Sequence, residues 1–175
     1  GQAPTIRVEA GSGIVLGDIQ AVGGVVSLLA GSGGILDADA LNGVVNDSDL
    51  DVSAARLRIS SGGTVGATVN HLETSVATVS ARAVDSIYLL ESDAISVGDV
   101  AGSITLGNGS APGAQSSPTD DISISAGTGG NVLIQAGVAS GDSTSDVTVG
   151  ADIVGVAGNV SVVASRSVAL TGTAD

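Results

Sequence analysis

The sequence consists largely of short runs in which apolar and polar residues alternate, each bounded by Gly, Asn, Asp or Ser. Representative runs are 5–10, 25–30, 55–60, 121–126, 131–136 and 159–164. Period-two alternation over four to seven residues, rich in Val and Ile, is typical of β-strands. The segment 72–83 is the longest that could form a helix. We nevertheless predict a long strand there, because Ala77, Val79, Ala81 and Ala83 would all fall on one face of a strand.

The runs also resemble one another. A loose consensus, Val/Ile-x-Val/Ile/Leu-x-Ala-Gly, fits 6–11, 26–31, 122–127 and 132–137. The spacing is irregular, so the sequence predicts a degenerate repeat within a single β-rich domain spanning 1–175. Two stretches interrupt the rhythm and are predicted as long loops, one at about 41–49 and one at about 107–120.

The composition limits the folds that these strands can form. The chain has 27 Gly, one Tyr and neither Phe nor Trp, so a core built from it must be thin and filled by Val, Ile, Leu and Ala. A β-solenoid (parallel β-helix) of roughly eight degenerate rungs meets this condition, since each rung of roughly 20 residues stacks on the next around a narrow interior. A β-sandwich is the alternative, although such folds usually bury a Trp or Tyr. We therefore favour the solenoid.

The glycine clusters have a simpler interpretation than ligand binding. Gly11 and Gly13, and likewise Gly31, Gly33 and Gly34, are not followed by a predicted helix whose N-terminus could hold a phosphate. We interpret them as turn glycines with positive φ.

The charge excludes several classes of protein. The sequence holds 18 acidic residues against five Arg and no Lys, a net charge of −13, with a mean hydropathy of +0.48. Five scattered Arg cannot neutralise a phosphate backbone, so no nucleic-acid binding is predicted. No apolar stretch approaches the roughly 20 residues of a membrane-spanning helix. Without Cys, the chain can form neither a disulfide nor a thiolate metal site.

One acidic stretch resembles part of a calcium loop. Asp47, Asp49 and Asp51 place carboxylates at alternate positions, and Asn46 adds an amide oxygen. However, Val52 stands where the turn glycine of such a loop would be, and no bidentate Glu follows at the usual distance. A solvated acidic loop is the favoured interpretation and a calcium site the alternative; no other cofactor is predicted.

Catalytic residues are not predicted. The only His, His71, lies in a turn-like segment and is interpreted as a surface residue, and the sequence has no Gly-x-Ser-x-Gly motif. The carboxylate pairs at 37/39 and 120/121 could suit a polysaccharide-cleaving enzyme, but such enzymes also need a nearby base, and a surface of this charge repels acidic sugars.

The middle of the chain carries a resemblance to a known family. The segments are Asn-His-Leu-Glu-Thr at 70–74, Ala-Arg-Ala at 81–83 and Ile-Tyr-Leu-Leu-Glu-Ser-Asp at 87–93. This progression, within 57–100, resembles the repeats of filamentous-haemagglutinin-like adhesins and similar giant bacterial surface proteins. The resemblance implies a right-handed β-helix, secretion, and a role as stalk or contact surface, and it brings no catalytic residues.

The predicted function is therefore a non-enzymatic structural module of an exported bacterial cell-surface protein. It would form an extracellular rod or stalk that mediates adhesion or surface contact, with cell-surface components or other copies of itself as partners. A self-assembling subunit of an extracellular filament, joined by end stacking or strand donation, is the first alternative. A carbohydrate-active β-helix enzyme is the second.

Overall fold

A computed structural model describes residues 3–39, 49–100, 104–105, 114–115, 122–138 and 141–171, of which 104–105, 114–115 and 122–125 are described by their backbone only. All named elements are strands, so the prediction of an all-β chain is confirmed. The strands are β1 (Thr5–Ala10), β2 (Ile14–Leu16), β3 (Ile19–Ala30), β4 (Ile35–Asp37), β5 (Val52–Ser61), β6 (Leu72–Ala83), β7 (Ile87–Glu91), β8 (Ile95–Val97), β9 (Ile104–Thr105), β10 (Ala114–Gln115), β11 (Ile122–Ala126), β12 (Val132–Ala136), β13 (Asp146–Val149), β14 (Asp152–Gly155), β15 (Val160–Ala164) and β16 (Ser167–Leu170).

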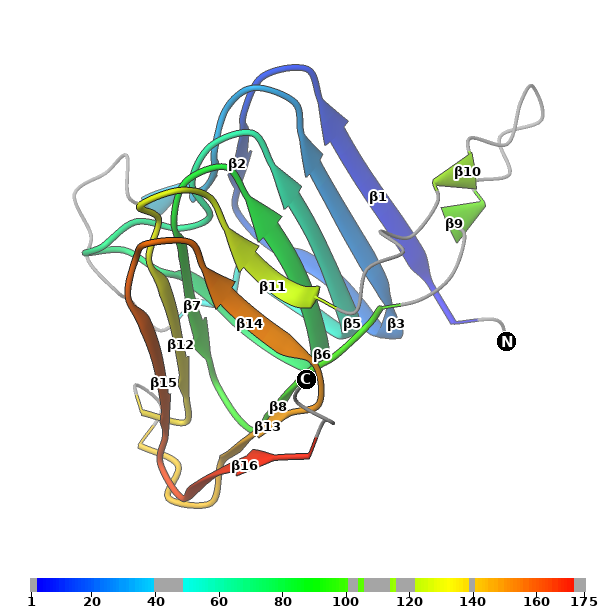
Figure 1. The fold of residues 1–175 in the computed structure, drawn as a ribbon. Helices are drawn as coiled ribbons and strands as arrows, with labels where there is room; N and C mark the ends of the chain where they lie inside the picture. Colours follow the sequence, from blue (N-terminus) through cyan, green and yellow to red (C-terminus); the bar gives the residue numbers. More distant parts are fainter. Residues whose placement is uncertain are drawn as a thin grey trace.

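The strands pair almost entirely in parallel. A 12-stranded sheet contains most of them, and β1, β3, β5, β6, β11 and β14 lie side by side in that order (Figure 1). Among the described strands, the antiparallel pairing that a β-sandwich requires is confined to β9 and β10. The parallel sheet is compatible with the predicted β-solenoid.

Three rows of residues in register run from β1, or from the two-stranded sheet of β2 and β4, to the strands of the last part of the chain. We call them ladders and name each after its first residue. The Ile6 ladder joins Ile6, Val26, Leu57, Val79, Val97, Val149 and Leu170. The Val8 ladder joins Val8, Leu28, Ile59, Ala81, Ile124 and Ile153. The Ile14 ladder joins Ile14, Ile35, Val65, Ile87, Val132 and Val160.

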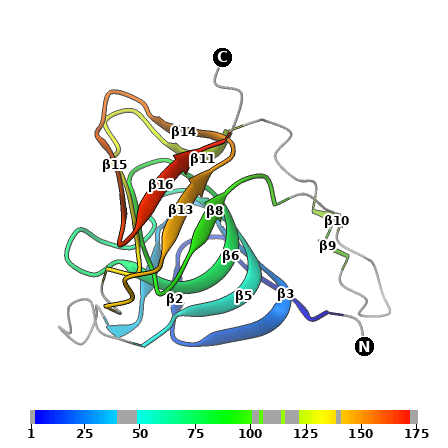
Figure 2. The ribbon, with the colours of Figure 1, turned by 90° about the horizontal axis from the view of Figure 1, so that it is seen from below.

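The core follows these ladders. The hydrophobic cluster of buried residues contains Val, Ile, Leu and Ala and no aromatic side chain, as the composition predicted. Seen from below, β14, β15 and β16 surround the interior on three sides (Figure 2). Side chains of alternate parity face outward, and the half-buried Tyr88 of β7 is among them.

The glycines at the corner after each long strand correct the sequence-based interpretation. Gly31 and Gly62 do not have positive φ, nor do Gly11, Gly13, Gly33 and Gly34; among the described residues, the glycines with positive φ are Gly23, Gly66, Gly129, Gly137 and Gly141. Instead, a Cβ on Gly31 would lie 2.5 Å from the carbonyl oxygen of Gly11, and one on Gly62 would lie 2.2 Å from that of Gly31. Close approach of neighbouring backbones, rather than φ, therefore requires glycine here.

The two predicted loops lie mostly outside the described residues. Of the first, 41–49, the structure describes Asp49; of the second, 107–120, it describes β10, which pairs with β9. Within the described part of the chain, no helix is long and apolar enough to cross a membrane.

Candidate metal centre

Three carboxylates converge inside the first part of the sheet. They belong to Asp37 at the end of β4, Asp51 just before β5, and Glu73 in β6, and all three residues are buried. One oxygen from each lies within 4.8 Å of the others. We call these three residues the carboxylate cluster.

The strand register creates this convergence. The Asp51 N–H donates to the Glu73 carbonyl oxygen at 2.9 Å, so these two acidic residues stand next to each other on adjacent strands. On its other side Asp51 accepts, through its carbonyl oxygen, a hydrogen bond from the Ile19 N–H at 2.9 Å. Asp37 joins them from the neighbouring strand β4, where it pairs with Leu16, a buried core residue. The cluster thus combines two residues from adjacent positions, Asp51 and Glu73, with Asp37 from β4.

Hydrogen bonds hold the side chains of Asp37 and Asp51. Asp37 accepts from the Asn70 side-chain amide and, at 3.0 Å, from the Asp39 N–H. Asp51 accepts from the Glu73 N–H at 2.9 Å. Burial raises the pKa of Asp51 to about 9, and the neighbouring Asp37 adds to the increase, while the Glu73 N–H opposes it. Without a cation, burial therefore favours the protonated form of Asp51.

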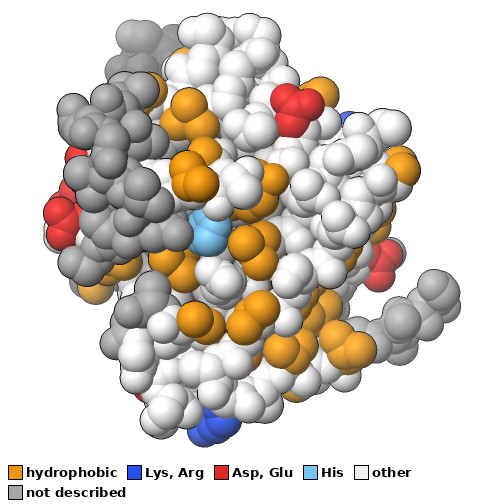
Figure 3. Space-filling view, turned by 90° about the vertical axis from the view of Figure 1, so that its left-hand side faces the viewer, with side chains coloured by type: hydrophobic (Ala, Val, Ile, Leu, Met, Phe, Trp, Pro, Cys, Tyr) orange, Lys and Arg blue, Asp and Glu red, His pale blue; other side chains and the backbone are white. Residues whose placement is uncertain are grey.

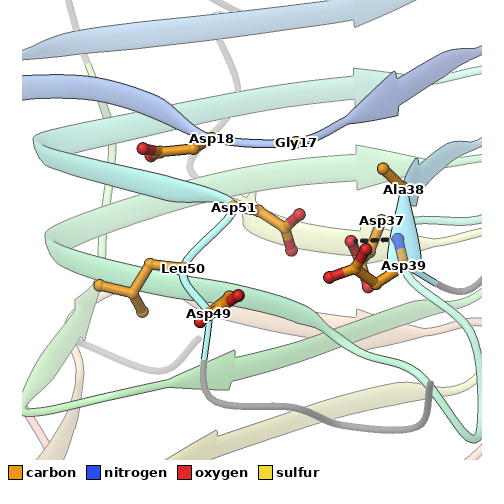
Figure 4. A pocket seen from close by; sticks show the side chains of 8 residues that line it. All are labelled: Gly17, Asp18, Asp37, Ala38, Asp39, Asp49, Leu50 and Asp51. Atoms are coloured by element: carbon orange, nitrogen blue, oxygen red, sulfur yellow. Dashed lines mark hydrogen bonds between the residues drawn. The ribbon is translucent and has the colours of Figure 1, made fainter.

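The cluster adjoins an open cavity of about 210 Å³. Figure 4 shows the Asp51 side chain pointing toward Asp37 and Asp39, whereas Asp18 points away from them. The described residues that line the cavity are Gly17, Asp18, Asp37, Ala38, Asp39, Asp49, Leu50 and Asp51, and no basic side chain is among them.

A hard divalent cation is the ligand that this chemistry fits. Ca²⁺ is bound through several oxygens of carboxylates and carbonyls, and the cluster offers three carboxylates. Thiolate and imidazole ligands, which softer metals prefer, are missing from the described cluster. The same geometry also has a purely structural use, since a protonated Asp51 can hydrogen-bond its acidic neighbours.

The three residues of the predicted calcium loop do not form one site in the structure. Asp51 belongs to the cluster, Asp49 lines the cavity, and Asp47 lies outside the described residues. The interpretation of this stretch as a solvated loop is wrong for Asp51, whose exposed fraction is 3%. Its place directly before β5 holds it between two neighbouring strands.

Sequence reasoning missed Glu73 as a site residue and assigned Asp37 only to a catalytic pair. A usable signal was present, because an acidic residue directly precedes Ile19, Val52 and Thr74, which occupy equivalent register positions. Comparing the residue before each strand segment, rather than reading one loop, would have identified the row.

The single His was also misplaced by sequence reasoning. His71 is 5% exposed rather than a surface residue, and burial lowers its pKa. Its ring stacks on Tyr88, with centroids 6.0 Å apart and planes 9° from parallel. In Figure 3 the His side chain lies among apolar side chains. The His71 ring thus packs against the one Tyr of the sequence.

A fourth buried carboxyl does not line the cavity. Glu91 is fully buried and accepts from the Thr74 hydroxyl at 2.8 Å and from the Val76 N–H at 3.1 Å. Burial is the main cause that raises its pKa to about 9, and Asp93 adds to it, against the effect of the two donors.

Comparison with models of protein families, with curated proteins and with solved structures finds no match to this chain. The resemblance of 57–100 to adhesin repeats therefore stays a prediction that rests on the residues themselves.

Proposed function

We propose that the chain is a right-handed β-solenoid that serves as a non-enzymatic structural module, a rod or stalk displayed on a bacterial cell surface. The observation that carries this proposal is the continuity of the Ile6, Val8 and Ile14 ladders, each of which connects the first strands to the last without a missing position. Ladders of this kind arise when successive turns of one chain stack along an axis.

Such stacking suits a mechanical role. Each turn contacts only its neighbours, so stiffness is built up along the axis and the outer surface stays free for contact. The net charge of −13 keeps separate molecules apart in solution. Adhesion would then depend on outward-facing side chains and loops rather than on a pocket.

The carbohydrate-active alternative has less support. The cavity next to the carboxylate cluster is lined by several Asp residues with no described basic side chain to stabilise a developing anion. An acidic sugar would also be repelled by these carboxylates. Release of reducing or unsaturated ends from a polysaccharide panel would favour this alternative over the structural role.

The proposal is tested on the cell surface and with the purified chain. Antibodies raised against residues 1–175 should label intact cells of the source organism, and beads coated with the chain should bind cells or host-surface components more than beads coated with an acidic control protein. Labelling that requires permeabilised cells would contradict the surface assignment, and equal bead binding would contradict the adhesive role.

A further inference from the structure

One outward face of the fold carries no charge. It is the outer side of β2, β4, β7, β12 and β15, the strands whose inward side chains form the Ile14 ladder. Because side chains alternate along a strand, the residues one and three positions after a ladder residue point outward. We call this surface the neutral face, and its accessible outward residues are Val15, Leu36, Tyr88, Leu133, Gln135, Ser161 and Val163.

Apolar side chains of the neutral face reach solvent. Val15 is 53% exposed and Val163 is 36% exposed. Leu36 is half-buried and pairs with Val15 on the adjacent strand. Tyr88 and Leu133 are half-buried and pair with each other in the same way. Figure 3 views this face and shows apolar side chains around the His, with charged side chains away from its centre. A group of neighbouring exposed apolar side chains is typical of an interaction site.

The other outward sheet faces of the described strands carry charge. The outward positions of β1, β5 and β6 hold both signs, in Arg7, Glu9, Arg56, Arg58 and Arg82. On β13, Asp146 points outward and pairs with Arg166. The neutral face therefore differs from its neighbours in offering an apolar surface with no charged group to desolvate.

We propose that the neutral face binds the neutral face of a second copy of the chain, so that rods displayed on two cells hold each other. This inference rests on the proposed surface function and names the partner in that contact. The charge distribution favours a second copy as the occupant. Two molecules of net charge −13 repel each other through faces that carry carboxylates, but at their neutral faces they can meet without removing any charge from water. Because the same surface lies on both sides, the contact is isologous and closes at two copies.

The size of the neutral face predicts a weak contact. The Ile14 ladder has six positions, and its strands contribute from three residues in β2 to five in β7. With strands about 4.8 Å apart and a rise of about 3.3 Å per residue, the face covers roughly 300–400 Å². Two copies would thus bury roughly 600–800 Å², less than the roughly 1,200 Å² of a stable complex. One pair of molecules should associate reversibly, and firm adhesion should need many copies binding at once.

Sedimentation equilibrium and tyrosine fluorescence of the purified chain test the contact. With increasing concentration, the apparent mass of the wild type should rise from that of a monomer toward that of a dimer, and more so in high salt, which screens the repulsion between copies. Tyr88 is the single Tyr and the sequence has no Trp, so its fluorescence reports on the neutral face. Quenching of that fluorescence by acrylamide should fall as the dimer forms. A monomer at every concentration, association that weakens in high salt, or association without a change in quenching would overturn the proposal.

Leu133→Asp and Thr148→Asp form a matched pair of variants. Both positions are half-buried, point outward and lie on strands that pair on both sides, but Thr148 belongs to β13, outside the neutral face. Leu133→Asp should weaken dimer formation about tenfold or more, because it places a carboxylate in the contact, whereas Thr148→Asp should dimerise like the wild type. Val15→Ser, at a more exposed position, tests the same face without adding charge and should weaken dimer formation severalfold. If Thr148→Asp and the neutral-face variants that fold all dimerise alike, the neutral face is not the contact.

Coated beads separate this inference from the proposed function. Beads coated with the wild type or with Thr148→Asp should aggregate, whereas beads coated with Leu133→Asp or Val15→Ser should stay dispersed. If wild-type beads bind cells or host-surface components but do not aggregate, the neutral-face contact is wrong and the adhesive rod stands. If they aggregate while antibodies label only permeabilised cells, the contact stands and the surface assignment is wrong. Binding to phosphatidylcholine vesicles as strong as the binding between beads would identify a lipid surface as the partner and overturn the second copy.

Discussion

Replacing Glu91 by Gln should stabilise the protein, and increasingly so as the pH rises. The carboxyl of Glu91 is fully buried, and its pKa is raised from 4.5 to about 9, so the folded protein keeps it protonated at neutral pH. The unfolded chain releases that proton above pH 4.5. At about 1.4 kcal/mol per pH unit, holding the proton at pH 7 costs the folded state about 3 kcal/mol.

The sign of the effect follows from the raised pKa. The penalty is absent below pH 4.5, grows between pH 5 and 9, and is complete above the folded pKa. Gln is neutral at every pH, and its amide oxygen can still accept from the Thr74 hydroxyl and the Val76 N–H. The advantage of Glu91→Gln over wild type should therefore increase by about 1.4 kcal/mol per pH unit, reaching about 3 kcal/mol at pH 7.

Urea unfolding of the wild type and Glu91→Gln at pH 5, 6, 7 and 8 measures this difference. Glu9→Gln is the matched control, because Glu9 lies in an exposed part of β1 and pairs with Arg7 at the surface. Its free energy of unfolding should stay within about 0.5 kcal/mol of wild type at each pH. Parallel pH profiles for wild type and Glu91→Gln would refute the reasoning, since they would show that Glu91 titrates alike in both states.

Three further predictions concern the cluster, the corners and the core. If the carboxylate cluster binds Ca²⁺, millimolar Ca²⁺ should raise the melting temperature of the wild type and leave that of Asp51→Asn unchanged; no shift in wild type, or equal shifts, would contradict the site. Gly62→Ala should lower the free energy of unfolding by about 1–3 kcal/mol because its Cβ would meet a carbonyl oxygen, whereas Gly17→Ala, with nothing within 4 Å, should lose little; equal losses in urea unfolding would contradict the close-approach explanation. Leu57→Ala should lose about 2–5 kcal/mol and Leu170→Ala, on the same ladder, under about 1 kcal/mol when measured on the monomer, which thermal unfolding at low concentration can check.

Local pattern was enough to predict the strands. The bounds of β1, Thr5–Ala10, and of β6, Leu72–Ala83, match the predicted runs, because alternation of apolar and polar residues is a property of consecutive positions. The absence of aromatic residues from the core was predictable for the same reason, since composition alone limits the side chains available.

The carboxylate cluster was not predictable from local pattern. Its members come from β4, from the residue before β5, and from β6, and they meet only because of how these strands are stacked. The spacing between neighbouring strands varies along the chain, with 31–51 separating β3 from β5 and only 62–71 separating β5 from β6. A single sequence with irregular spacing does not reveal which acidic residues become neighbours.

The buried polar residues also resolve a difficulty that a degenerate repeat creates. A shift of two residues between β6 and β7 would keep every apolar side chain facing inward, so hydrophobic burial distinguishes such registers poorly. In the observed register Glu91 pairs with Thr74, whose hydroxyl donates to its carboxyl. The shift would place Glu91 beside Leu72 or Val76 and deprive it of that hydroxyl, which is costly for a fully buried polar group. The polar positions in the interior thus select one register among several that the apolar pattern permits, at the expense of stability at high pH.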